Sequence, residues 1–218
     1  APDGRHVLLA ASTLRLLRLD TWKRVCRFSG HASATRHAAF SHDGTLLLSA
    51  AADRSMSLWA VSYSAKADDD DAPLVASFAF DADVVALGFA PASDAESATS
   101  SYTWFALTSD GDLHLWRVTA AALCAPSPKA KKGSKRPPPP RVPPKPACVV
   151  RVAAAPGASA AAEDPLRIFH AAFAAPDKLL VAHGSKVRPM VEFVPIEKAR
   201  SGGALLESIA IRRSTADI

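Results

Sequence analysis

The residue types that carry most enzyme chemistry are present in this sequence, but they are not grouped into a catalytic motif. Ser41, His42 and Asp43 have the residue types of a hydrolytic triad, yet they follow one another directly on a turn. Adjacent side chains there cannot line up as nucleophile, base and orienter. The tripeptide GSK occurs at 133–135 and 184–186 without the glycine-rich loop of a phosphate-binding motif. The sequence therefore predicts no catalytic residue and no enzyme activity.

Metal and cofactor chemistry is not indicated either. The seven histidines are scattered, and no group of His, Cys or acidic residues has the spacing of metal ligands. His37, His114 and His170 fall on predicted strands, where we expect structural histidines rather than ligands. The three cysteines are an odd number without a CxxC pair, which favours a reducing, intracellular setting. We expect no metal, no cofactor and no small-molecule substrate.

The positive charge is concentrated in one segment. The chain of 218 residues has a net charge of +5, but the segment 126–146 holds seven basic residues and no acidic one, which leaves −2 for the remainder. Nine prolines between 126 and 147 prevent regular packing, so we expect a disordered or polyproline-like insertion. The basic residues are Lys129, Lys131, Lys132, Lys135, Arg136, Arg141 and Lys145.

Several roles remain open for this insertion. It suits contacts with RNA phosphates that depend on salt and carry no sequence preference, although it has no aromatic residue to stack on bases. The stretch KAKKGSKRP is also typical of a nuclear or nucleolar address. A ligand for proline-recognition domains and a solvated linker are the other interpretations.

An acidic segment at 65–73 contains four consecutive aspartates. We expect a solvated surface loop there, with a contact for a basic partner or one weak cation site as the alternatives.

The elements that must position these residues are predicted to be short β-strands. The apolar runs have strand length and end at turn residues, and several alternate with polar residues, most clearly SLWAV and HLWRV. There is no long 3.6-residue periodicity. No run reaches 18 apolar residues, so we expect no membrane span. The predicted fold class is all-β.

Two segments of the chain repeat the same pattern. AADRSMSLWAV matches TSDGDLHLWRV, and each places an Asp six residues before a Trp: Asp53 and Trp59, then Asp110 and Trp116. A weaker copy has Leu17 at the Trp position, 42 residues before Trp59. A period in the low forties with four short strands per unit indicates a β-propeller.

The stretch 28–62, with its Gly-His pair, Asp-Gly turn and Trp, resembles a blade of the WD-repeat family. The resemblance implies a buried hydrogen-bonded chain of four residues, in which His and the Trp N–H supply the hydrogen bonds that a buried Asp needs. These residues are His31, Ser49, Asp53 and Trp59. In the next blade only Thr108, Asp110 and Trp116 match, because no Gly-His pair precedes it.

The repeats predict a partial WD-repeat propeller of about four blades. The expected blades span 7–28 (partial), 31–80, 84–152 and 166–210, followed by a tail at 211–218. A closed propeller has four to eight blades, so we expect the chain to begin inside a larger protein and to form half of a ring. An open half would leave strand edges that invite pairing with another chain.

The order of the motifs narrows the family. The segment RVCRFSGHASATRHAAF opens a blade, a Lys/Pro-rich insertion follows HLWRV, and HGSKVRPMVEFV comes near the end. This order resembles the second half of the propeller in the fifth U-three-associated protein family, the nucleolar WD-repeat subunits of the small-subunit processome. The resemblance covers about residues 1–197. It implies a non-catalytic scaffold in pre-rRNA transcription and early 18S rRNA processing, located in the nucleus and nucleolus.

The partners implied by this resemblance are other processome WD-repeat subunits, and pre-rRNA or snoRNA at the basic insertion. Two rival functions remain. A generic WD-repeat adaptor in ubiquitin ligation, chromatin or trafficking would bind a peptide on one face of a full propeller. An enzyme built on a propeller would cluster ionisable residues at the central channel.

Overall fold

The computed structural model describes residues 1–10, 13–63, 71–92, 101–119, 123, 145–146, 148–151, 167–184 and 189–195, and its named elements are all β-strands. The expected all-β class is confirmed. The strands are β1 (His6–Ala10), β2 (Leu14–Arg18), β3 (Arg24–Phe28), β4 (Thr35–Phe40), β5 (Leu46–Ala51), β6 (Ser55–Ala60), β7 (Leu74–Ala79), β8 (Val84–Phe89), β9 (Ser101–Thr108), β10 (Asp112–Thr119), β11 (Cys148–Arg151), β12 (Arg167–Ala175), β13 (Lys178–Gly184) and β14 (Pro189–Pro195).

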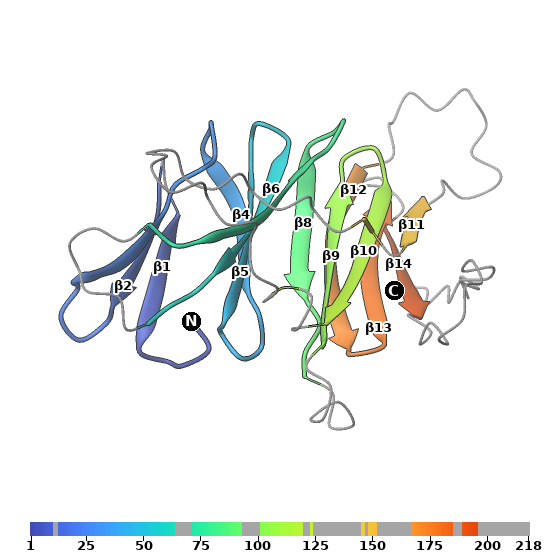
Figure 1. Ribbon diagram of the computed structural model, residues 1–218. Helices are drawn as coiled ribbons and strands as arrows, with labels where there is room; N and C mark the ends of the chain where they lie inside the picture. Colours follow the sequence, from blue (N-terminus) through green and yellow to red (C-terminus); the bar gives the residue numbers. More distant parts are fainter. Residues whose placement is uncertain are drawn as a thin grey trace.

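The strands form four antiparallel sheets that follow one another along the chain (Figure 1). Their orders are β1-β2-β3, β4-β5-β6-β7, β8-β9-β10-β11 and β12-β13-β14. We call them the first to the fourth sheet. Every strand pairs with its neighbour in sequence, so each sheet is a meander whose first and last strands are its edges.

The first strands of the second, third and fourth sheets lie next to one another, because β8 contacts both β4 and β12. These three strands are the inner strands of the assembly. In the first sheet, β3 comes directly before β4 as β7 comes before β8. The strands β1, β2 and β3 therefore correspond to β5, β6 and β7, and the described residues include no inner strand for the first sheet.

The core lies between the sheets, because alternate residues of a strand point to opposite faces. In β5, Leu47 packs against the first sheet together with Leu16 and Phe28. The next residue, Leu48, packs on the other face in a cluster with Trp104 of the third sheet. A third cluster joins the third and fourth sheets through Leu107, Leu113, Phe105, Leu179 and Val181.

Several sequence predictions fall outside the described residues. These are most of the acidic segment 65–73, most of the basic insertion 126–146, the end of the last predicted blade and the tail 211–218. Within the described residues, no helix is long and apolar enough to cross a membrane.

Candidate functional site

A relay of hydrogen bonds connects two strands of the second sheet, β5 and β6, with the two loops that hold His31 and Asp53. The indole Nε1 of Trp59 donates to Ser49 Oγ over 2.8 Å, and Ser49 Oγ lies 2.6 Å from His31 Nε2. His31 Nδ1 lies 2.9 Å from Ser55 Oγ, which donates to Asp53 Oδ1 over 2.5 Å. Ser49 and Trp59 are fully buried. The structure therefore brings together all four residues expected in this blade.

The protonation of His31 follows from this relay. Burial lowers the pKa of His31 and outweighs the opposing effect of the Asp53 carboxylate, so the ring is neutral at pH 7. The Ser55 hydroxyl is already committed to Asp53. The contacts of the neutral ring with the two hydroxyls are satisfied when Nδ1–H donates to Ser55 Oγ and Nε2 accepts the hydroxyl proton of Ser49.

The role expected for Asp53 needs correction. The expectation was a buried carboxylate that accepts directly from His31 and Trp59. Instead Asp53 is exposed. It accepts from the backbone N–H groups of Ala32 and Ser55 at 2.9 and 3.0 Å, as well as from the Ser55 hydroxyl. Sequence reasoning missed Ser55, although a Ser two residues after a turn Asp is the signal of an Asx turn.

The third sheet does not repeat the relay, and its register shows why. Ala106 lies ten residues before Trp116, as Ser49 lies ten residues before Trp59. The expectation that Thr108 takes the role of Ser49 is therefore wrong. Thr108 aligns with Ala51 of β5, and its buried hydroxyl donates to Asp110 Oδ1 within the turn after β9.

The place of His31 is taken by Phe80 in the third sheet. Thr35 pairs with Ala51 and Val84 pairs with Thr108, so the two inner strands start at equivalent positions. His31 and Phe80 each lie four residues before these starts. The ring of Phe80 lies 6.4 Å from Trp116 at 88°, and the ring of His31 lies 6.3 Å from Trp59 at 68°.

Aromatic packing thus replaces hydrogen bonding around Trp116. Its ring stacks on Trp104 with centroids 6.0 Å apart and on His114 at 5.8 Å, while Phe78 makes an edge contact at 5.2 Å. Burial lowers the pKa of His114, so this stacked ring is neutral at pH 7. His114 is a half-buried residue whose ring packs against Trp116 and Phe80.

Polar side chains also connect neighbouring sheets. Tyr102 of β9 donates to Asp43 Oδ2 in the β4–β5 turn over 2.7 Å. Arg27 of β3 binds Asp71 at the end of the acidic segment through Nε at 2.8 Å. Arg36 of β4 binds Asp83, just before β8, at 3.0 Å. Asp71, a described residue of the acidic segment, therefore contacts the first sheet through Arg27.

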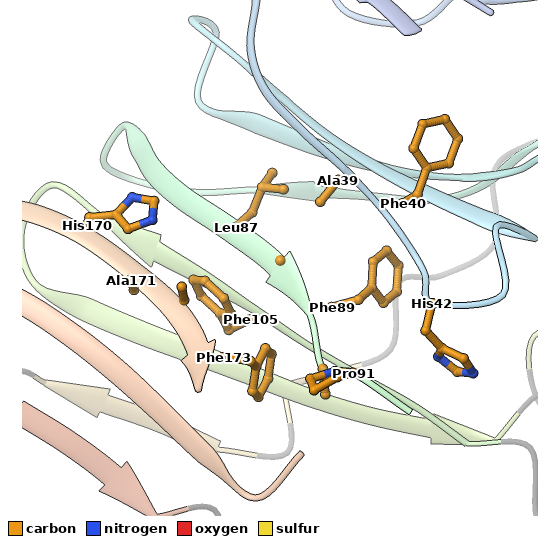
Figure 2. A pocket seen from close by; sticks show the side chains of 13 residues that line it. Ala39, Phe40, His42, Leu87, Phe89, Pro91, Phe105, His170, Ala171 and Phe173 are labelled. Atoms are coloured by element: carbon orange, nitrogen blue, oxygen red, sulfur yellow. The ribbon is translucent and has the colours of Figure 1, made fainter. Parts of the chain in front are cut away.

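A hollow of about 500 Å³ opens between the inner strands (Figure 2). It is mostly apolar, and its titratable side chains, His42 and His170, lie at opposite ends of the group in Figure 2. The apolar residues include Phe40, Leu87, Phe89, Phe105 and Phe173. Such a hollow fits an apolar side chain of a partner. It holds no pair of carboxylates, and the described residues contain no cluster of metal-ligating groups.

The seven basic residues of the insertion are not brought into this site. Lys145 is described and exposed, and the other six lie outside the described residues. Their roles therefore remain predictions from the sequence.

Comparisons with known proteins identify the fold. No protein-family model and no curated protein matches the chain. A solved structure of KlHsv2, with its loop 6CD replaced by a Gly-Ser linker, matches at 11% identity and a TM-score of 0.52, over 86% of this chain and 50% of that one. The Cps50 (Swd1) β-propeller domain of Myceliophteria thermophila matches at 14% identity and a TM-score of 0.52, over 89% and 51%. The chain has a WD40-type β-propeller fold.

The chain spans about half the length of the two solved propellers, and the expected partial propeller is confirmed. At these identities the similarity establishes the fold alone, since one fold carries many functions.

Proposed function

We propose that this propeller is a non-catalytic scaffold subunit of small-subunit ribosome biogenesis, acting in pre-rRNA transcription and early 18S rRNA processing. The place of the basic segment 126–146 on the fold carries the proposal. It lies between β10 and β11, which pair from Asp112–Arg151 to Leu115–Cys148. The strands on either side of the insertion therefore pair with one another at the edge of the third sheet. The sequence thus carries a long basic segment between two strands that remain paired.

The chemistry of the insertion fits an RNA partner. Its lysines and arginines suit phosphate contacts, and the absence of aromatic residues within it suits backbone rather than base recognition. The proposed partners are pre-rRNA or snoRNA at this segment and other processome WD-repeat subunits at the sheet surfaces. The proposed location is the nucleolus. The order of sequence motifs supports this process over others that use the same fold.

A non-catalytic role fits the described site. The polar groups around Trp59 are committed to the relay through Ser49, and the hollow between the inner strands has two widely placed histidines as its titratable groups. Neither arrangement supplies a general acid and a general base facing one another. We therefore assign no catalytic residue, cofactor or small-molecule substrate to this chain.

The test is a pull-down of the tagged protein from cells at moderate salt, with bound RNA and proteins identified. A variant with 126–146 replaced by a Gly/Ser linker of equal length is compared with one in which only the seven basic residues are replaced by Gln. Recovery of U-three snoRNA and pre-18S RNA by the unaltered chain, and its loss in both variants, is the expected result. Recovery of chromatin, ligase or coat components without these RNAs would overturn the proposal.

A generic protein adaptor is the second candidate, and the hollow between the inner strands favours it. An apolar recess with aromatic walls suits a buried anchor side chain from a peptide. The variant Leu87→Glu places a charge in this recess, whereas Lys178→Glu changes an exposed residue of β13. An adaptor predicts that Leu87→Glu alone abolishes protein partners while the RNA recovered is unchanged.

A further inference from the structure

The basic insertion contains no aromatic ring, but a pair of rings lies where the chain leaves the third sheet toward it. Tyr102 pairs with Val118 between β9 and β10, so the two side chains share a face of the sheet. The segment 126–146 begins eight residues after Val118. Leu123, which lies between them in the sequence, packs against the same core cluster as Tyr102 and Val118. The connection from β10 to the insertion therefore starts beside Tyr102.

The second ring of the pair is His42, in the turn between β4 and β5. The centroids of the His42 and Tyr102 rings are 6.1 Å apart, and the ring planes are inclined at 35°. His42 is exposed and Tyr102 is half-buried. The second and third sheets supply one ring each, and each of these sheets packs against a described sheet on both sides. The pair is therefore open to solvent at the ends of the strands, where no further blade would cover it.

Hydrogen bonds hold this pair in place. The hydroxyls of Tyr102 and Thr45 donate to Asp43 Oδ2 over 2.7 and 2.8 Å. The Ser41 hydroxyl and the Thr45 backbone N–H donate to Asp43 Oδ1 over 2.6 and 3.1 Å. The turn that carries His42 is thus fixed to the tip of the Tyr102 side chain. A ring that is already fixed loses little conformational entropy when a ligand stacks on it.

We propose that the His42–Tyr102 pair stacks on a base of a single-stranded RNA whose phosphates are bound by the basic insertion, an inference that rests on the proposed function. Tyrosine and histidine rings are common stacking partners of unpaired bases, and such stacking tolerates any base because every base has a π face. The pair thereby supplies the aromatic surface that the insertion lacks.

The charges around the pair favour this ligand over a peptide. Burial raises the pKa of Asp43, but hydrogen bonds from Ser41, Tyr102 and Thr45 lower it to about 2, so the carboxylate is charged at pH 7. It repels phosphates and acidic side chains, which leaves an uncharged base as the group that faces the pair. A basic peptide would suit Asp43, but the seven cations of the insertion would repel it. A single strand offers uncharged bases and charged phosphates together.

The test measures the binding of a fluorescent 12-nucleotide oligouridine to the full chain by anisotropy. His42→Ala is expected to weaken binding at least about fivefold, the loss of one stacked base. His42→Trp offers a larger ring and should strengthen binding, a gain that no loss of folding can imitate. His170→Ala removes an exposed histidine at the opposite end of the hollow (Figure 2) and is the matched control. Tyr102→Phe keeps the ring and should keep the affinity, which separates stacking from the contact with Asp43.

Two further measurements make the outcome decisive. An RNA duplex has its bases stacked on one another, so His42→Ala should not change its binding. The same series in the chain with the Gly/Ser linker at 126–146 separates this inference from the proposed function. If the linker abolishes oligouridine binding while His42→Ala and His42→Trp bind like the unaltered chain, this inference is overturned and the insertion remains the RNA site. If the unaltered chain does not bind oligouridine, both are overturned.

Discussion

Phe80 occupies in the third sheet the position that His31 occupies in the second. Both rings meet a tryptophan edge-on at centroid distances of 6.4 and 6.3 Å. His31 bridges Ser49 and Ser55 by hydrogen bonds, whereas Phe80 contacts His114 and Trp116 by ring packing. The same backbone position thus supports either a polar relay or an aromatic cluster. The outcome depends on the residue beside the tryptophan: β5 offers the hydroxyl of Ser49 there, whereas β9 has Ala106.

Ser49 is expected to be the most sensitive hydroxyl of the second sheet. Ser49→Ala leaves the Trp59 indole N–H and the Nε2 of His31 without their partner in a buried site. An unpaired buried polar group costs about 1–3 kcal/mol, so the free energy of unfolding should fall by at least that amount. Urea denaturation measures it. Ser109→Ala, on an exposed serine, is the control and should change stability by less than about 0.5 kcal/mol.

His31 is expected to be neutral, with its proton on Nδ1. The pKa of His31 is lower in the folded chain, so the unfolded chain binds a proton more readily. The stability that the neutral ring provides is therefore fully present above about pH 6.5. It is lost as the pH falls from there through the folded pKa. Nitrogen NMR of the ring should show Nδ1 protonated at pH 7.5 and titration below 6.5. A ring protonated on Nε2 would contradict the relay.

Asp43 is expected to stabilise the contact between the second and third sheets through Tyr102. Burial alone would raise the pKa of Asp43, but hydrogen bonds from Ser41, Tyr102 and Thr45 lower it to about 2. A lowered carboxyl pKa gives stability that is complete above about pH 4 and is lost as the pH falls toward 2. Asp43 is exposed, so solvent screening reduces its contribution to about 1 kcal/mol.

The measurement for this contact is a double-mutant cycle of Asp43→Asn and Tyr102→Phe in thermal unfolding. The two changes should be non-additive at pH 7 and should become more nearly additive as the pH falls toward 2, where about half of the Asp43 carboxyl groups are protonated. Asp177→Asn, on an exposed turn of the fourth sheet, is the matched control. Full additivity at pH 7 would show that the hydrogen bond between the two sheets adds nothing to stability.

Gly44 is expected to tolerate no side chain, for two reasons that a pair of variants can separate. Its φ is +73°, and an added Cβ would lie 2.5 Å from the Tyr63 hydroxyl. Gly4 has a similar φ of +64° with open space around it. Gly4→Ala should therefore cost only the strain of about 1 kcal/mol, and Gly44→Ala clearly more in denaturant unfolding. Gly44→Ala combined with Tyr63→Phe should recover part of the difference.

The sequence predicted the strands and the positions of Trp59 and Trp116, because alternating burial and the Asp-to-Trp spacing are local signals. It did not predict that Phe80 takes the position of His31 in the third sheet. The two loop positions can be matched only when the register of β4 with β5 and that of β8 with β9 are known. Thr108 was matched to Ser49 because it has a hydroxyl group, although it lies eight residues before Trp116 and Ser49 lies ten residues before Trp59. The contact of Asp43 with Tyr102 joins residues 59 positions apart, which no local pattern reveals.

Because Phe80 and His31 occupy equivalent positions, we expect that part of the relay can be transferred to the third sheet. Phe80→His alone and Ala106→Ser alone each place a polar group in an apolar cluster, and each should lower the free energy of unfolding. Together they restore the pair that Ser49 and His31 form, so the double variant should be more stable than the sum of the single changes by about 1 kcal/mol. Thr108→Ser with Phe80→His is the matched control, because Thr108 aligns with Ala51. Urea unfolding of all five variants gives the coupling energies, and equal coupling in both pairs would refute the assigned register.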